Sequence, residues 1–159
     1  MKIFLDTCYF LPIIGISNSN LDPNYLLKLL DHKDSHDLLY STITLFELQA
    51  KGAKECEKGN LDPQRILRGI QSLTQGGDFS EIHLSSSSLI TQLSMELRKY
   101  HTDFIKCLIL ATAIVSADIL VSEDRWINGF VDTNDYSNLV DTYQLSKNFG
   151  VSRSRKFIL

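Results

Sequence analysis

Short, mostly apolar runs alternate along this chain with longer stretches in which apolar residues recur at helical spacing, and this alternation is the feature that most restricts the fold. Runs of this length, bounded by polar residues, are typical of strands buried in a sheet. They predict strands at residues 2–5, 38–42, 82–84, 118–122 and 139–143. Because helices separate the strands, we expect an α/β fold with a mostly parallel sheet of four to five strands and helices on both faces.

Capping residues mark the expected helix starts. Asp22 and Asp62 are each followed by proline, which combines an N-cap with a favoured first-turn residue. Thr44 is expected to open a helix that runs to about residue 58, and Thr102 to cap a helix over residues 103–116. The latter is apolar around almost its whole girth, so we expect it to be buried on several sides.

Length and composition predict one folded domain spanning residues 1–159. Hydrophobic residues make up 43% and charged residues 22%, as in ordinary globular proteins. No apolar run approaches the ~20 residues of a membrane-spanning helix, and the first run meets Asp6 too early to be a signal-peptide core. Cys8, Cys56 and Cys107 form no CxxC pair, so we expect reduced thiols in a cytoplasmic protein.

The net charge of −3 does not by itself indicate a nucleic-acid partner. An acidic metal centre would contribute several of the negative charges, and a basic face could still exist locally. The candidate basic residues fall in two stretches of the sequence: Lys51, Lys54, Lys58, Arg65 and Arg68, and then Arg153, Arg155 and Lys156.

Four acidic residues occupy corresponding places at strand ends and helix starts. Asp6 closes the first predicted strand, and Asp124 follows the fourth. Asp103 opens a helix, and Glu47 lies in the first turn of a helix that directly follows a strand. Ligands of open parallel sheets collect at the carboxyl ends of the strands, where the strand order reverses. We therefore expect all four side chains to project toward one edge of the sheet.

A cluster of carboxylates repels itself unless a divalent ion neutralises it. Oxygen ligands without cysteine or histidine companions suit Mg²⁺ or Mn²⁺ better than zinc. Such an ion can activate water and stabilise the charge that develops on a phosphoryl group. Phosphodiester hydrolysis is the chemistry that this pattern favours.

Each acid also has a purely structural interpretation. Glu47 could complete a capping box with Thr44, Asp103 could stabilise a helix N-terminus, and Asp124 could be a turn residue. Asp6 is the hardest to explain in this way, because an aspartate closing an apolar strand has no evident structural task.

The four acids lie in short motifs that resemble those of the PIN-domain family, in the family's order. Residues 3–7, IFLDT, resemble its opening strand and first acid, and residues 41–48, STITLFEL, resemble the motif of the second acid. Residues 103–113, DFIKCLILATA, are similar to the third motif, a helix that an aspartate opens. Residues 120–124, LVSED, resemble the fourth, in which a strand leads to a hydroxyl residue and an aspartate.

The resemblance implies a PIN-like, Rossmann-like α/β/α sandwich and Mg²⁺- or Mn²⁺-dependent cleavage of single-stranded RNA. It implies that an activated water attacks the phosphorus without a covalent enzyme intermediate. It further implies a homodimer and, for a toxin of the VapBC type, a cognate antitoxin protein. The metal-binding and catalytic residues that it implies are Asp6, Glu47, Asp103 and Asp124, with Thr7 and Ser122 as supporting hydroxyls.

Other functions remain open at this point. A PIN-like chain can be a free-standing RNA-processing nuclease, or a non-catalytic scaffold in an RNA-processing complex whose usual mark is the loss of acids. A phosphatase of the haloacid-dehalogenase type would need a second aspartate where this chain has Cys8. Cys8 as a nucleophile would need a partner base, and no histidine is close to it in sequence.

Three further features of the sequence bear on the site. Residues 52–91 are longer than the matching part of compact toxin members and predict an extra helix. Glu123 adds a carboxylate beside Asp124. Trp126 could stack on a base, although packing against the sheet edge is the main expectation for it.

Overall fold

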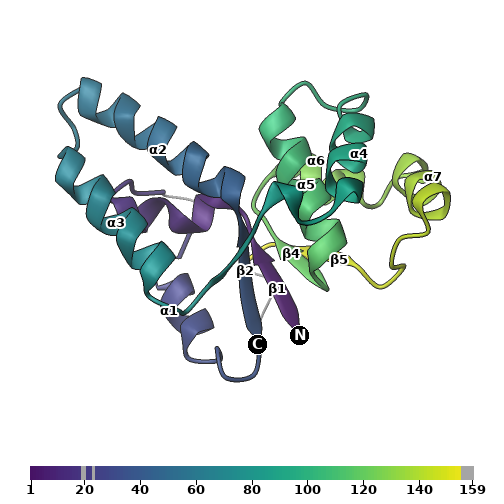
Figure 1. The fold of residues 1–159 in the computed structure, drawn as a ribbon, viewed down its shortest axis with the longest axis horizontal. Helices are drawn as coiled ribbons and strands as arrows, with labels where there is room; N and C mark the ends of the chain where they lie inside the picture. The colour runs from purple at the N-terminus through teal and green to yellow at the C-terminus, as the bar shows by residue number, and fades with distance from the viewer. Residues whose placement is uncertain (19–20, 23, 155–159) are drawn as a thin grey trace.

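The structure is a computed structural model that describes residues 1–18, 21–22 and 24–154. A five-stranded, wholly parallel sheet with the strand order β3-β2-β1-β4-β5 forms its centre. Helices cover both faces of this sheet (Figure 1). The predicted α/β fold with a parallel sheet between two layers of helices is therefore confirmed.

The central strand β1 (Lys2–Leu5) pairs with β2 (Asp37–Ser41) on one side and with β4 (Ile119–Val121) on the other. The short strands β3 (Ser80–Ile82) and β5 (Gly150–Ser152) form the two edges. The chain first builds outward from β1 to β3 and then returns to β4 on the opposite side. The order of the strands thus reverses between β1 and β4, which places a topological switch point there.

One face of the sheet is covered by the N-terminal helices (Figure 1). Ile3 and Leu5 point into this core, because alternate residues of a strand face opposite sides. They pack with buried side chains of the helical segments, including Phe10 and Leu48. The segments on this face are η1 (Thr7–Ile14), a 3₁₀ helix, α1 (Tyr25–Leu30), α2 (Thr42–Glu57) and α3 (Pro63–Gln75).

The opposite face carries the C-terminal helices (Figure 1). Phe4 points into this second core and packs among residues of α5 (Phe104–Ser116), which is buried along most of its length, as predicted. The other segments of this half are η2 (Leu84–Ser86), α4 (Ser88–Leu97), α6 (Arg125–Phe130) and α7 (Asn134–Tyr143). Within the described ranges, no helix is long and apolar enough to cross a membrane.

The prediction of a strand at residues 139–143 is wrong, because these residues belong to α7. The Thr133 hydroxyl caps this helix by accepting a hydrogen bond from the backbone N–H of Tyr136. Tyr136, Leu139 and Val140 then share one buried face at helical spacing. A short apolar run does not by itself distinguish a strand from a helix. The fifth strand is instead β5, which begins at Gly150, with six residues between it and the end of α7.

Several element boundaries also differ from the predictions. Helix α2 begins at Thr42 and is capped by the Ser41 hydroxyl, not by Thr44. Helix α5 is capped by Asp103 rather than by Thr102. The strand expected at residues 82–84 lies at Ser80–Ile82. The helix starts at Asp62 and near Asp22 are close to those predicted, although Pro23 lies outside the described residues.

Candidate functional site

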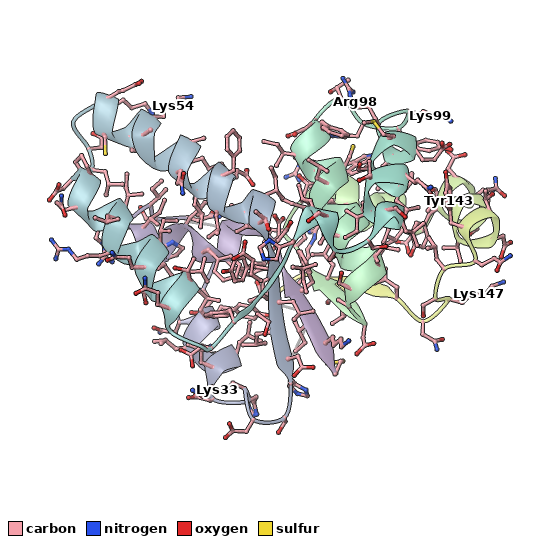
Figure 2. All side chains as sticks on the ribbon, viewed as in Figure 1. Lys33, Lys54, Arg98, Lys99, Tyr143 and Lys147 are labelled. Atoms are coloured by element: carbon pink, nitrogen blue, oxygen red, sulfur yellow. The ribbon has the colours of Figure 1, made fainter. Side chains whose placement is uncertain are left out.

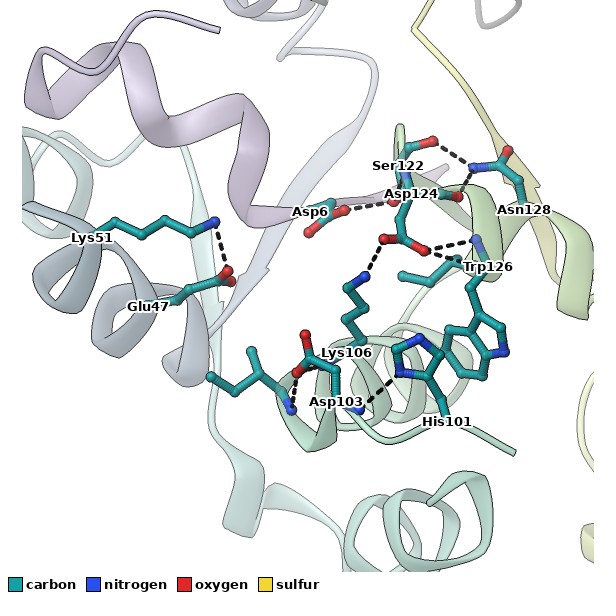
Figure 3. A network of polar contacts seen from close by, with 12 residues as sticks. Asp6, Glu47, Lys51, His101, Asp103, Lys106, Ser122, Asp124, Trp126 and Asn128 are labelled. Atoms are coloured by element: carbon teal, nitrogen blue, oxygen red, sulfur yellow. Dashed lines mark hydrogen bonds and ion pairs between the residues drawn. The ribbon is translucent and has the colours of Figure 1, made fainter. Parts of the chain in front are cut away.

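The four predicted acids gather at the carboxyl edge of the sheet, around the switch point between β1 and β4. Asp6 directly follows β1, and its backbone N–H still bonds to the carbonyl of Val121 in β4, at 3.1 Å. Asp124 follows β4, Glu47 lies on α2 after β2, and Asp103 precedes α5. Figure 3 shows the four side chains facing a common space. The structure thus brings together residues that are up to 118 positions apart in the sequence.

Ser122 connects two of these acids. Its hydroxyl is fully buried and donates a hydrogen bond of 2.5 Å to Oδ2 of Asp6. The same oxygen accepts the backbone N–H of Asp124, at 3.1 Å. Asn128 braces the turn by donating from its amide to the carbonyl oxygens of both Ser122 and Asp124, each at 2.8 Å. Ser122 therefore ties the end of β1 to the start of α6.

Among the four acids, Asp6 has the most strongly shifted pKa. Its partial burial raises the pKa from 3.8 to about 6, although the hydrogen bond from Ser122 acts in the opposite direction. The neighbouring carboxylates of Glu47 and Asp124 raise this pKa further, and the backbone N–H of Thr7 lowers it. A carboxyl group whose charge is disfavoured in this way is stabilised by a nearby cation.

Asp124 divides its two oxygens between two tasks. Oδ1 caps α6 by accepting the backbone N–H groups of Trp126 and Ile127, at 2.9 and 3.0 Å. Oδ2 pairs with the ammonium group of Lys106, at 2.6 Å. Burial would raise the pKa of Asp124, but Lys106 and the two backbone donors outweigh it, so the pKa lies below its ordinary value. Asp124 is therefore a capping residue as well as a member of the acidic edge.

Asp103 is also a helix cap. Its Oδ1 accepts the backbone N–H groups of Ile105 and Lys106, at 3.1 and 3.4 Å. Its own backbone N–H donates to Nδ1 of His101, at 3.0 Å. Asp103 therefore does stabilise a helix N-terminus, as its structural interpretation predicted. This capping does not exclude a ligand role, because a carboxylate has a second oxygen.

Glu47 does not complete the capping box that its spacing from Thr44 allowed, because α2 starts earlier. It pairs instead with Lys51, one turn further along the helix, at 2.7 Å. Each of the two acids on the flanks of the site, Glu47 and Asp124, therefore has a lysine at its carboxylate (Figure 3).

Thr7 gives a further indication of what the site can hold. Its hydroxyl is buried next to Asp6 and has no hydrogen-bond partner among the described residues. A buried hydroxyl without a partner is costly, which favours a ligand or water at this point. The donor set is made of oxygens only, which suit Mg²⁺ and Mn²⁺. The positive charge of the Lys106 ammonium group also lies among the acids. The residues present fit such an ion, although no three potential ligands in the described ranges form a preassembled metal cage.

Glu123 is turned away from the acidic edge. Its Oε1 accepts hydrogen bonds from the Tyr9 hydroxyl at 2.9 Å and from the backbone and hydroxyl of Ser154 at 2.9 and 2.6 Å. The extra carboxylate in the fourth motif therefore holds η1 and the segment after β5 together.

The structure does not favour Cys8 as a nucleophile or Trp126 as a base-stacking residue. Burial and then the charge of Asp6 raise the pKa of the Cys8 thiol, which disfavours a reactive thiolate. Trp126 packs against His101 and Phe130, with ring centroids 4.3 and 5.2 Å apart, so packing is what the structure shows for it.

Two of the predicted basic residues are paired with acidic side chains. Lys51 belongs to the acidic site, and Lys58 pairs with Glu55. Lys54 lies at the outer end of α2 (Figure 2). Arg155 and Lys156 are outside the described residues.

Sequence reasoning did not predict the ion pair of Lys106 with Asp124 or the hydrogen bond of His101 with Asp103. It also did not predict the ion pair of Lys51 with Glu47. The spacing of Lys51 from Glu47 could have indicated their pairing, because residues four apart meet on a helix. No comparable signal links Lys106 to Asp124, which lies on a different element.

A parallel sheet between two helical layers, with acids at its switch point, defines a PIN-like α/β protein, and the predicted fold resemblance is confirmed. Among solved structures, the chain is similar to one in the crystal structure of VapBC2 from Rickettsia felis bound to a DNA fragment from its promoter. The match covers 96% of this chain and 98% of that one, with a TM-score of 0.56 and 18% identity. At this identity the likeness concerns the fold alone. No protein-family model and no curated protein matches the sequence.

Proposed function

We propose that this protein is a Mg²⁺- or Mn²⁺-dependent endoribonuclease that hydrolyses phosphodiester bonds of single-stranded RNA. The observation that carries the proposal is the convergence of Asp6, Glu47 and Asp124 at the switch point, close enough for the last two to raise the pKa of the first. A PIN-like fold and four acids in motif order support the same function.

In this proposal, Asp6, Glu47, Asp103 and Asp124 hold the ion, and the Thr7 and Ser122 hydroxyls support it. When bound, the ion supplies neutralisation of the carboxylates, activation of water and stabilisation of charge on the phosphoryl group. Ser122 orients Asp6 through their hydrogen bond and also accepts the backbone N–H of Asp124. The helix caps at Asp103 and Asp124 fix one oxygen of each carboxylate.

We further infer a toxin of the VapBC type as the biological setting, with an antitoxin protein as partner and a homodimer as the assembled form. The similar structure, which is one of VapBC2, supports this setting. A free-standing processing nuclease would have the same chemistry. A small DNA-binding protein encoded next to this chain, and a stable complex of the two when they are co-expressed, would distinguish the toxin from the processing enzyme.

The test is cleavage of end-labelled single-stranded RNA by the purified protein in Mn²⁺, Mg²⁺ or EDTA. Asp6→Asn, Glu47→Gln, Asp103→Asn and Asp124→Asn are compared with a control, Asp141→Asn. This control changes an exposed carboxylate on α7 that pairs with Lys147. We expect metal-dependent cleavage that each site variant abolishes and that the α7 variant retains. Cleavage that persists in Asp6→Asn would reject the site. No cleavage together with no Mn²⁺ binding would favour a non-catalytic scaffold.

A further inference from the structure

The ammonium group of Lys106 lies among the acids that are proposed to hold the metal. Nζ is 2.6 Å from Oδ2 of Asp124 (Figure 3). The negative charges of Asp103 and Asp6 also act on it and, after the hydrogen bond to Asp124, raise the pKa of this lysine. Three carboxylates from three segments of the chain thus share one internal cation.

Lys106 holds the very oxygen that a metal would need. Oδ1 of Asp124 is committed to two backbone N–H groups at the start of α6. Oδ2 is the remaining oxygen of this carboxylate, and it is the one that pairs with Lys106. An ion that bound Asp124 through Oδ2 would therefore meet the ammonium group directly, and the two cations would repel each other.

Lys106 is more exposed than the carboxylate that it pairs with. Its side chain is 34% exposed, whereas that of Asp124 is 19% exposed, so the lysine reaches the site from the solvent side. Its four-carbon stem is flexible, and an ammonium group is readily hydrated once released. A divalent ion brings twice the charge to the same carboxylates and can replace the lysine.

We propose that Lys106 is a displaceable counter-cation, which holds Oδ2 of Asp124 while the acidic edge lacks metal and gives way when a divalent ion binds. The proposal rests on the proposed function, because it presupposes that the acids take a metal. It also accounts for the absence of a preassembled cage in the described part of the chain, since Asp124 and Glu47 are each drawn toward a lysine. Metal loading is then an exchange of cations rather than the filling of an empty site.

The experiment is calorimetric titration of the full chain with MnCl₂, for the wild type, Lys106→Met, Lys106→Arg and Lys99→Met. Methionine keeps the length of the stem and removes the charge, whereas arginine keeps the charge. Lys99→Met is the matched control, because it breaks a lysine–glutamate pair of 2.7 Å that lies outside the site. We expect Lys106→Met to bind Mn²⁺ roughly tenfold more tightly than the wild type, since one competing positive charge is gone. The arginine and control variants should bind as the wild type does.

A second measurement, thermal unfolding in EDTA, gives a readout without metal. We expect Lys106→Met to melt at a lower temperature than Lys99→Met, because its carboxylates lose their neutralising cation, and we expect Mn²⁺ to reverse the difference. If the wild type binds Mn²⁺ and Lys106→Met binds it no more tightly, the displacement proposal is overturned while the nuclease proposal stands. Binding by Lys106→Met alone would show that a divalent ion does not displace Lys106 from Asp124, and it would contradict both the displacement proposal and a metal-dependent wild type. Absence of binding in every variant would overturn both.

Discussion

The hydroxyl of Ser122 donates a 2.5 Å hydrogen bond to Asp6 and so connects two residues that follow neighbouring strands. β1 and β4 are adjacent in the sheet, but the chain leaves their ends in different directions, to η1 and to α6. The Ser122 hydroxyl joins the two strand ends through its bond to Asp6, and it also accepts the backbone N–H of Asp124. This buried hydroxyl therefore contacts both acids and helps to set their relative position.

Replacing this hydroxyl tests its contribution to stability. Ser122→Ala removes a hydrogen bond to a partly buried carboxyl group, so we expect the free energy of unfolding to fall by about 2 kcal/mol. Urea denaturation in EDTA measures the change. Ser137→Ala, which removes an exposed hydroxyl on α7, is the control and should cost less than about 0.5 kcal/mol. Equal effects of the two variants would contradict the role given to Ser122.

Asp6→Asn is expected to stabilise the metal-free protein while abolishing cleavage. The pKa of Asp6 is raised from 3.8 to about 6 in the folded state, so the folded chain binds the proton more tightly than the unfolded chain does. The unfavourable contribution of Asp6 is therefore absent below about pH 4 and grows as the pH rises to about 6, reaching at most about 3 kcal/mol.

The measurement is the difference in unfolding free energy between Asp6→Asn and the wild type across this pH range, in EDTA. The difference should increase in favour of the variant up to about pH 6 and then level off. A difference that does not vary with pH would show that the folded state does not disfavour the Asp6 charge.

The pKa of Glu123 is lowered in the folded protein, whereas that of Asp6 is raised, so we expect ionised Glu123 to stabilise the fold. Burial alone would raise its pKa, but the hydrogen bonds from Ser154 and Tyr9 outweigh it and hold the pKa below 4.5. Its stabilisation is therefore present above the unfolded pKa of 4.5 and is lost as the pH falls through the lower folded pKa. Glu123→Gln should destabilise the protein at pH 7 by about 2 kcal/mol.

Chemical denaturation at pH 7 and at about pH 3 checks this expectation. The cost of Glu123→Gln should shrink at the lower pH, where the wild-type carboxylate is itself protonated. Glu57→Gln, at an exposed position near the end of α2, should cost little at either pH. RNA cleavage should survive Glu123→Gln, because this side chain faces away from the acidic edge.

Gly69 allows α3 to pack closely on η1. A Cβ at this position would lie 2.7 Å from the backbone oxygen of Ile13 and 2.9 Å from Cγ2 of Ile14. Gly69→Ala should therefore destabilise the protein by about 2 kcal/mol, because backbone must move. At Gly129 of α6 nothing lies within 4 Å of an added Cβ, so Gly129→Ala should be neutral or stabilise by up to about 1 kcal/mol. Thermal melts of the two variants provide the comparison.

The local pattern of the sequence determined most of the fold. Apolar runs predicted β1, β2 and β4, and the aspartate–proline pair at Asp62 predicted the start of α3, because strand periodicity and helix capping depend on residues a few positions apart. The same reasoning failed at residues 139–143, where the capping residue Thr133 and the packing of Leu139 favour a helix over a strand. The 3₁₀ helix η1 after Asp6 was not predicted.

For the site, the sequence by itself determined which acids stand at strand ends and helix starts, and their ligand role stays a prediction. Only the tertiary structure decided what each carboxylate contacts. Glu123 and Asp124 are neighbours in sequence, yet one bonds to Tyr9 and Ser154 and the other to Lys106. The order of the strands brings β1 beside β4 and so sets these contacts. That order depends on how both helical layers pack, a property of the whole chain that no short motif contains.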